Sequence, residues 1–418
     1  MHMKKPELLL PAGNPEVLKI AIRYGADAVY IGAEQYSLRA KAGNFTREEM
    51  KDSIEFAHAR GKKVYVTANI FARNSDIDGA RNFFQKLSEL HPDAILISDP
   101  GLFAIAKDVC PEIDLHISTQ ANTTNYASCN FWYEQGARRI VTARELSLDE
   151  IRTLQKKIPS DLEIETFVHG AMCISYSGRC LLSNYFTGRD ANLGACTHAC
   201  RWKYSLVEET RPGQYLPIEE DERGTYILNS KDLCMIRHIP ELCEAGIDSF
   251  KIEGRMKTAL YVATMARAYR RAIDLYFSSP EQYEARKDDF LGEVSDGTYR
   301  SYTTGFFFGR PDADSQIYES NTYIRTYTYL GTVGNQNETG GYHIEQRNKF
   351  SVGETIEVMK PNGDNIEAAV LHIYDENGAE VMSAPHPKQN LWVDLGVPLE
   401  PYDILRRREP EREALEQS

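Results

Sequence analysis

The sequence contains no long apolar run. Its opening apolar stretch, residues 8–12, is too short for the core of a signal peptide and leads directly into a turn. No segment approaches the roughly 20 consecutive apolar residues that span a bilayer. We therefore expect neither a signal peptide nor a membrane-spanning segment. We expect a cytoplasmic protein with no membrane partner, in which thiols stay reduced.

An excess of positive charge is also missing. The formal net charge of −13 argues against non-specific nucleic-acid binding, because phosphate binding needs clustered lysine and arginine. The charge is unevenly distributed, however. Residues 251–271 contain six basic residues and one acidic residue, whereas residues 219–222 are all acidic. A local basic face is therefore compatible with the acidic total.

Several catalytic and cofactor motifs are absent. There is no H-E-x-x-H zinc motif and no G-x-S-x-G nucleophile turn. No glycine-rich dinucleotide fingerprint follows the first expected strand, at residues 11–15. The closely spaced cysteines of bacterial ferredoxins and of radical S-adenosylmethionine enzymes are missing as well. These absences remove the usual sequence support for zinc peptidases, serine hydrolases and dinucleotide-binding sheets.

The sequence does contain a regular alternation of β-rich runs and helical patterns. Helix starts are marked by Asn14 before Pro15 and by a capping box from Ser147 to Glu150. Eight runs predict strands, at residues 8–11, 27–32, 63–71, 93–98, 114–119, 139–143, 163–168 and 249–253. Alternating β and α units predict a parallel sheet, and eight of them favour an α/β fold of the TIM-like (β/α)8 barrel type. A doubly wound open sheet is the competing fold.

The alternation changes at two places, which divide the chain. About 80 residues, 169–248, separate the seventh and eighth strands as a cysteine-bearing insertion. We assign residues 1–277 to the barrel, 278–316 to a linker and 411–418 to a tail. Residues 317–410 show alternating apolar residues and Asn-Gly turns, which predict a small all-β, barrel-like domain. The arginines at 406–408 are followed by glutamates, and we expect them to be solvated.

Four of the eight cysteines lie in the insertion and form the strongest candidate metal site. Cys173 and Cys180 are separated by six residues, and Cys196 and Cys200 by three. Four thiolates suit zinc or an iron–sulfur cluster. The spacing of these cysteines fits the usual zinc knuckles poorly, so it favours an iron–sulfur cluster but leaves zinc open. The alternative is that the four cysteines do not form a common site. Cys234 is a candidate substitute ligand, with a place in the core or beside the ligands as the alternative. The remaining cysteines are expected in the core: Cys110, Cys129 and Cys243.

Polar residues at the predicted strand ends form a second candidate site, since barrel enzymes place their chemistry there. The set comprises Tyr30, Asn69, His116, Gln120, Asn122, Glu165, His169, Lys251, Glu253, Arg255 and, just beyond, Lys257. His116, His169 and Glu165 are candidate acid–base groups, with burial in the core as the alternative for the histidines. The cations would bind an anionic partner such as RNA phosphate, unless they pair with sheet-end carboxylates. Asn69, Gln120, Asn122 and Glu253 are candidate substrate-binding residues.

The segments around these residues resemble the collagenase-like peptidase family U-32. The similarity is carried by HGAMC at residues 169–173, YSGRCLLS at 176–183, GACTHACRWKY at 194–204, NSKDL at 229–233 and SFKIEGRMK at 249–257. It extends over residues 5–395. The arrangement with a C-terminal β domain is similar to family members that hydroxylate the wobble uridine of tRNA.

This resemblance implies an enzyme that forms 5-hydroxyuridine in tRNA without molecular oxygen. It also implies that the pathway needs prephenate, which is a candidate co-substrate. It also implies a 4Fe-4S cluster on the four cysteines of the insertion, and it makes prephenate carboxylates a second candidate ligand for the cations. A shorter paralogue is a further candidate partner. Two alternatives stay open: a peptidase, as the family name suggests, and a zinc-stapled RNA-binding scaffold. A Cys173–His169 pair is the available nucleophile for a peptidase, but a cluster ligand cannot also act as a free nucleophile.

Overall fold

The computed structural model describes most of the barrel and the C-terminal domain. The described residues are 4–38, 44–172, 182–189, 191, 196–197, 199, 206–207, 215–216, 231–297, 301–309, 326–338 and 340–409. Within these ranges, no helix combines the length and the apolar character that a membrane crossing requires.

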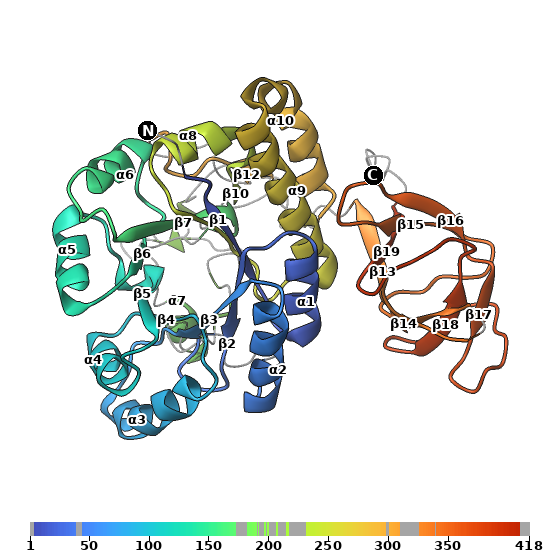
Figure 1. Cartoon of the computed structure of the whole chain (residues 1–418), viewed down its shortest axis with the longest axis horizontal. Coiled ribbons are helices and arrows are strands. Elements are labelled where there is room, and N and C mark those ends of the chain that lie inside the picture. Colours follow the sequence, from blue (N-terminus) through green and yellow to red (C-terminus); the bar gives the residue numbers. More distant parts are fainter. Residues whose placement is uncertain are drawn as a thin grey trace.

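The predicted (β/α)8 barrel is confirmed. Eight parallel strands follow one another in the order β11-β1-β2-β3-β4-β5-β6-β7, and pairing of β11 with β7 closes the ring. Figure 1 shows β1 to β7 at the centre of this domain, with helices outside them. Their bounds are β1 (Glu7–Pro11), β2 (Ala28–Gly32), β3 (Lys63–Ala68), β4 (Ala94–Ile97), β5 (Asp114–Ile117), β6 (Arg139–Val141), β7 (Glu163–Gly170) and β11 (Ser249–Ile252). These strands are buried almost throughout, as expected for a parallel sheet covered by helices.

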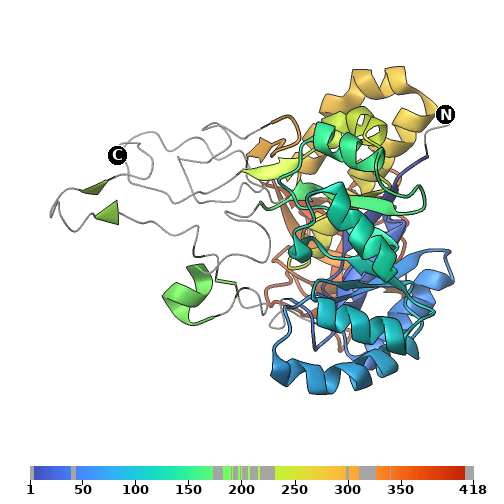
Figure 2. The ribbon, with the colours of Figure 1, turned by 90° about the vertical axis from the view of Figure 1, so that its left-hand side faces the viewer.

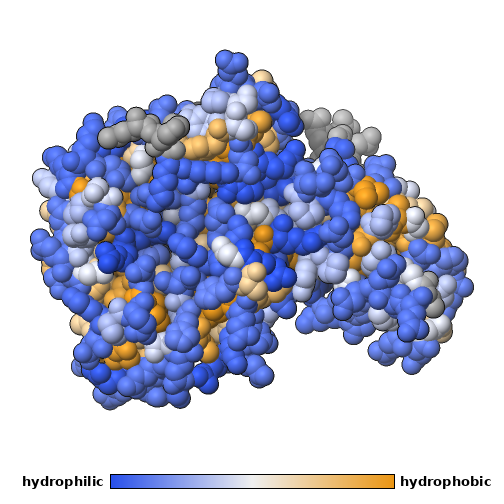
Figure 3. Space-filling view, in the orientation of Figure 1, coloured by the Kyte–Doolittle hydropathy of each residue, from blue (hydrophilic) through white to orange (hydrophobic). Residues whose placement is uncertain are grey.

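Helices surround the barrel, and their starts follow the capping signals in the sequence. The Asn14 side chain accepts a hydrogen bond from Val17 N, and Ser147 and Glu150 form the predicted capping box. The helices are α1 (Pro15–Arg23), α2 (Arg47–His58), α3 (Asn74–Ser88), α4 (Pro100–Val109), α5 (Tyr126–Gln135), α6 (Leu148–Gln155), α8 (Ile239–Glu244) and α9 (Ala259–Ser278). In this orientation, hydrophilic residues cover most of the visible surface (Figure 3).

The insertion and the region after α9 extend the barrel. Strand β10 (Asp232–Cys234) pairs antiparallel with β7, and β12 (Tyr302–Thr303) pairs with β10. Helix α10 (Pro280–Ser295) packs along α9, so the stretch that we assigned to a linker carries elements of the barrel domain. Three short elements of the insertion project beyond one end of the barrel (Figure 2). They are α7 (Leu182–Thr187), β8 (Leu206–Val207) and β9 (Tyr215–Leu216).

The C-terminal domain is an antiparallel half-barrel of seven strands, in the order β16-β15-β19-β13-β14-β18-β17. Glycines in the two predicted Asn-Gly turns, Gly363 and Gly378, have positive φ. The strands are β13 (Tyr327–Gln336), β14 (Tyr342–Gln346), β15 (Thr355–Met359), β16 (Ile366–Ala369), β17 (His372–Tyr374), β18 (Asn390–Asp394) and β19 (Ile404–Arg408). The expectation of solvated arginines is wrong for Arg406, which is buried in β19 and ion-paired with Glu357.

The two domains are packed against each other. Met359 and Ile404 of the half-barrel belong to the apolar cluster of the barrel. The buried Tyr24 hydroxyl donates a hydrogen bond to Met359 O (2.7 Å), and Arg267 Nη1 donates to Lys360 O (2.9 Å). Buried hydrogen bonds and apolar contacts together fix the half-barrel against α1 and α9.

Candidate active site at the barrel mouth

A cavity of about 120 Å³ opens at the carboxyl ends of the barrel strands. Most of its polar lining comes from positions at or just after a strand end, which is where barrel enzymes carry their functional groups. The polar and charged lining residues are Tyr30, Thr67, Asn69, Ser118, Thr119, Gln120, Arg144, Lys251, Glu253 and Arg255. Five of the predicted substrate-binding residues therefore meet in one cavity: Asn69, Gln120, Lys251, Glu253 and Arg255.

Three cations line the cavity, Arg144, Lys251 and Arg255. Two of them pair with carboxylates, Lys251 with Glu165 and Arg144 with Glu253, as in the alternative of sheet-end pairing. Arg255 Nη1 donates hydrogen bonds to Ser37 Oγ (2.7 Å) and Thr67 Oγ1 (3.0 Å), which fix the orientation of its guanidinium. Guanidinium groups held in this way suit planar anions such as carboxylate and phosphate.

Lys251 forms the floor of the cavity and links it to buried acids below. Its Nζ lies 2.6 Å from Glu165 Oε1 and 4.5 Å from the centroid of the Tyr30 ring. Burial opposes the charge of Glu165, but Lys251 and Arg139 outweigh it and lower the pKa of this carboxyl. Glu165 is therefore ionised and acts as a counter-ion, an arrangement unlike that of a protonated general acid.

His116 lies on β5, outside the cavity lining. It is almost completely buried on β5, and its ring packs edge-on against Tyr65 with the centroids 5.0 Å apart. Burial, with Arg139 and Lys251 nearby, holds the pKa of His116 well below its usual range. The imidazole is consequently neutral at physiological pH, as in the alternative of a core histidine.

His169 is turned away from the cavity. A β-bulge between β11 and β7 interrupts the register at this residue, and its ring packs against Tyr261, Tyr269 and Tyr302. Burial lowers the pKa of His169 to about 3, and its Nδ1 lies 3.3 Å from the Tyr269 hydroxyl. This environment matches the alternative of a core histidine.

Two predicted substrate-binding residues lie outside the mouth cavity. Lys257 lines a different cleft, between the barrel rim and the half-barrel. Asn122 ends the short 3-10 turn Thr119–Ala121 with φ 53°, and its Nδ2 donates to Gln120 O (3.1 Å). Asn122 therefore shapes the loop that carries Gln120.

The cysteines fall into two groups. Of the four candidate ligands, Cys196 is within the described residues and is exposed, whereas Cys173, Cys180 and Cys200 lie outside them. Among the described side chains, no three His, Cys, Asp or Glu residues converge as a metal site. The others are buried as expected: Cys110, Cys129 and Cys243, together with Cys234. Cys234 lies on β10 opposite His169, and burial raises the pKa of its thiol to about 11.

Arg144 is a cavity residue that sequence reasoning missed. It follows β6 by three residues, so the rule of polar strand ends could have found it. Its guanidinium stacks over Phe167 at 4.0 Å, lies 3.7 Å from Glu253 and donates a hydrogen bond to Ala171 O (3.0 Å). Arg144 thus connects the cavity to the chain segment that leads into Cys173.

The loops at the mouth approach each other closely at Gly13. A Cβ atom at this position would lie 2.6 Å from the carbonyl oxygen of Arg255, and a backbone atom cannot move aside easily. We expect Gly13→Ala to lower the free energy of unfolding by about 1–3 kcal/mol, as overpacked sites do. Chemical denaturation measures the change.

Gly292→Ala provides the matched control for Gly13→Ala. Gly292 is exposed on α10, and a Cβ atom added there would have no neighbouring atom within 4 Å. Alanine at this position should leave the stability unchanged or raise it by about 1 kcal/mol, through its higher helix propensity. Equal stability of the two variants would contradict this prediction, because it would show that the loops can move apart at Gly13 without loss of stability.

Comparisons with known proteins agree with this architecture. The model of peptidase family U32 matches residues 13–317, and that of the peptidase family U32 C-terminal domain matches residues 325–406. The chain is 42% identical to tRNA hydroxylation protein P1 of Bacillus subtilis, over 97% of this chain and 95% of that protein. It is 38% identical to tRNA hydroxylation protein P of Escherichia coli, over 97% of both.

A further relative has a different name. An uncharacterized protease of Methanocaldococcus jannaschii is 43% identical over 87% of this chain and 89% of that protein. The matching family models cover both domains of the structure, and the resemblance seen in the sequence motifs is confirmed. The chain belongs to peptidase family U32 and carries the C-terminal domain of that family.

Proposed function

We propose that this protein is a tRNA-modifying enzyme that hydroxylates the wobble uridine to 5-hydroxyuridine without molecular oxygen. The observation that carries the proposal is the cavity at the barrel mouth, which Arg144, Lys251 and Arg255 line and which Arg144 connects to the segment that leads into the cysteines. The full-length similarity to proteins named for tRNA hydroxylation supports the substrate. An RNA substrate would approach the carboxyl end of the barrel, where the cavity opens.

The cavity suits a small anionic co-substrate, and we propose prephenate. Its carboxylates would meet the guanidinium groups of Arg144 and Arg255. Asn69, Ser118 and Gln120 add polar groups that can orient a bound anion. The ion pair between Lys251 and Glu165 keeps the lysine in place under the cavity.

We propose that Cys173, Cys180, Cys196 and Cys200 hold a 4Fe-4S cluster. The donor set fits, because thiolates are the usual ligands of such clusters and Cys196 is exposed. The chain next to Cys196 is anchored, since Thr197 N donates a hydrogen bond to Ser183 Oγ of α7 (2.9 Å). A bound cluster would supply electron transfer, and zinc on the same thiolates is the alternative.

The test is mass spectrometry of tRNA nucleosides from a strain that lacks this gene and any paralogue. We expect 5-hydroxyuridine and its derivatives to disappear and to return when the wild-type gene is restored. Unchanged hydroxyuridine in the deletion strain would refute the proposed substrate. Protease activity of the purified protein on gelatin, retained after loss of the four cysteines, would instead favour the peptidase reading.

A further inference from the structure

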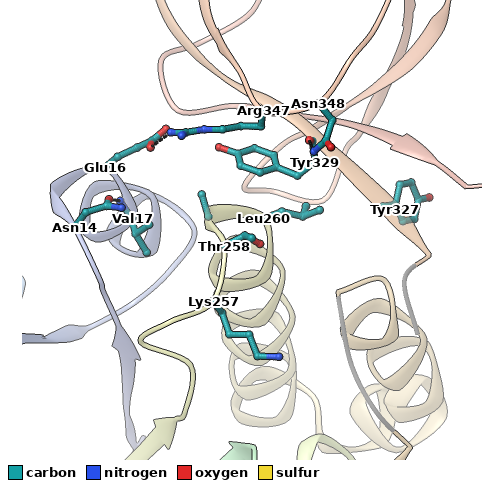
Figure 4. Close-up of a pocket in the computed structure, with 11 residues that line it drawn as sticks. Asn14, Glu16, Val17, Lys257, Thr258, Leu260, Tyr327, Tyr329, Arg347 and Asn348 are labelled. Atoms are coloured by element: carbon teal, nitrogen blue, oxygen red, sulfur yellow. Dashed lines mark hydrogen bonds and ion pairs between the residues drawn. The ribbon is translucent and has the colours of Figure 1, made fainter. Parts of the chain in front are cut away.

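The cleft between the barrel rim and the half-barrel is larger than the mouth cavity, with a volume of about 320 Å³ (Figure 4). Its charged groups are engaged in other contacts, however. Arg347 lies 2.7 Å from a carboxylate oxygen of Glu16 and 2.9 Å from one of Glu345. The Lys257 ammonium points away from the cleft in Figure 4 and lies 5.1 Å from the centroid of the Tyr261 ring. The mouth cavity is therefore the better place for a small anion.

Arg255 differs from the other cations of the mouth cavity in the kind of group that holds it. Lys251 and Arg144 lie beside carboxylates, at 2.6 Å and 3.7 Å. Arg255 is almost completely buried, and it donates hydrogen bonds to the hydroxyls of Ser37 and Thr67. A hydroxyl is neutral, so it orients a guanidinium without cancelling its positive charge. These two contacts therefore preserve the attraction of Arg255 for an anion.

The two hydroxyls and the guanidinium form a closed triangle of hydrogen bonds. Arg255 Nη1 lies 2.7 Å from Ser37 Oγ and 3.0 Å from Thr67 Oγ1, and the two hydroxyl oxygens are 2.7 Å apart. Thr67 donates its own proton to Ile31 O (3.0 Å), so its oxygen can only accept hydrogen bonds from Arg255 and Ser37. The triangle is complete only while a donor occupies the position of Nη1.

Gly32 makes room for this triangle. It is the last residue of β2 and is the sheet partner of Thr67 on β3. A Cβ atom at Gly32 would lie 2.4 Å from Arg255 Nη1 and 2.7 Å from Ser37 Oγ. The nearest atoms all belong to side chains, so a larger residue would displace the guanidinium and leave the main chain in place.

We propose that Gly32, Ser37 and Thr67 are positioning residues, which aim the guanidinium of Arg255 at a carboxylate of the anion bound in the mouth cavity. This inference rests on the proposed function, because it takes prephenate as that anion. The cavity volume of about 120 Å³ favours a small anion over a nucleotide. A guanidinium that is already fixed loses little freedom when it binds a planar carboxylate, so the affinity is higher.

The test measures the affinity of the anaerobically purified full-length protein for prephenate by isothermal titration calorimetry. Thr67→Val removes the hydroxyl and should weaken binding by about 3- to 30-fold, whereas Thr67→Ser keeps it and should stay within about 2-fold of the wild type. Gly32→Ala displaces Arg255 and should weaken binding as much as Thr67→Val. Thr264→Val is the matched control, because this hydroxyl is also buried but donates to Leu260 O (2.8 Å) within α9. It should leave the affinity unchanged.

A double-mutant cycle shows whether Thr67 acts through Arg255. Arg255→Met alone should weaken prephenate binding by about 10- to 100-fold, because it removes the charge that meets the carboxylate. Adding Thr67→Val should then change the affinity by less than about 2-fold, since the group that Thr67 positions is gone. A merely structural role of Thr67 would instead give additive losses of affinity, with a lowered Tm in both backgrounds.

The outcomes separate this inference from the proposed function. If Thr67→Val and Gly32→Ala bind prephenate as tightly as Thr264→Val, or if the losses in the cycle are additive, the inference is wrong and the proposed function stands. If the wild type does not bind prephenate, the proposed co-substrate and this inference fail together. If Thr67→Val does not fold, Gly32→Ala replaces it in the cycle. Loss of tRNA affinity with unchanged prephenate affinity would assign Arg255 to an RNA phosphate and overturn the inference.

Discussion

Replacing Arg139 with methionine should lower the free energy of unfolding by about 3–5 kcal/mol at neutral pH. Arg139 is almost completely buried inside the barrel, where its guanidinium lies 2.6 Å from Glu7, 2.6 Å from Glu163 and 3.0 Å from Glu165. Methionine fills similar space but leaves these carboxylates without their shared cation. Urea or guanidinium denaturation at neutral pH measures the change.

The pH dependence of the Arg139 variant follows from the carboxyl groups. Burial opposes ionisation of Glu163 and Glu165, but Arg139 and the neighbouring lysines lower both pKa values. In the wild type this contribution to stability is present above the usual glutamate pKa of about 4.3 and is lost as the pH falls through the lowered values. Without Arg139 the pKa values of Glu163 and Glu165 rise. Acidification should therefore reduce the difference in free energy of unfolding between the wild type and the variant.

Arg138→Met is the control for this prediction. Arg138 is the adjacent residue, but its side chain is 57% exposed and its nearest carboxylate contact, with Asp161, is 3.6 Å. Exposed pairs of this kind contribute little, so we expect a change within about 0.5 kcal/mol. Similar losses in the two variants would contradict the role given to the buried network.

Replacing any one of Cys173, Cys180, Cys196 and Cys200 with serine should remove most of the bound iron. We expect about four irons per chain in the anaerobically purified wild type and a hydroxylation activity at least about 100-fold lower in each variant. The reason is that loss of one thiolate leaves one iron of the cluster without its protein ligand and makes the cluster labile. Iron and sulfide analysis with an absorption spectrum provides the measurement.

Cys234→Ala and Cys129→Ala are the matched controls, because both thiols are buried and burial raises their pKa values, to about 11 and about 12. Both variants should keep their iron. Loss of iron from Cys234→Ala alone would make Cys234 a ligand. A colourless wild-type protein that binds one zinc would contradict the cluster.

Much of the fold could be predicted from local signals. The runs at residues 8–11 and 27–32 became β1 and β2, because continuous apolar residues suit strands buried on both faces. Ser147 and Glu150 marked the start of α6 through a capping box, which depends only on nearby residues. Helix α10 was missed, because its surface is largely charged and its packing along α9 is a tertiary contact.

The site was predictable only as far as strand ends could be placed. Asn69, Gln120, Lys251, Glu253 and Arg255 meet at the mouth because parallel strands end at the same edge. His169 was placed by the same rule, but the β-bulge turns it toward the tyrosines of α9. Lys257 lies only two residues beyond Arg255, yet the half-barrel makes it part of another cleft, and no sequence pattern indicates how the domains dock.

The most direct test of the proposed function is an oxygen-free assay with purified protein. The iron-loaded wild type is incubated with unmodified tRNA, prephenate and an extract of the deletion strain, which supplies any missing partner. We predict that 5-hydroxyuridine forms at the wobble position without oxygen and that omission of prephenate prevents it. Absence of hydroxyuridine, or its formation only when oxygen is admitted, would contradict the account.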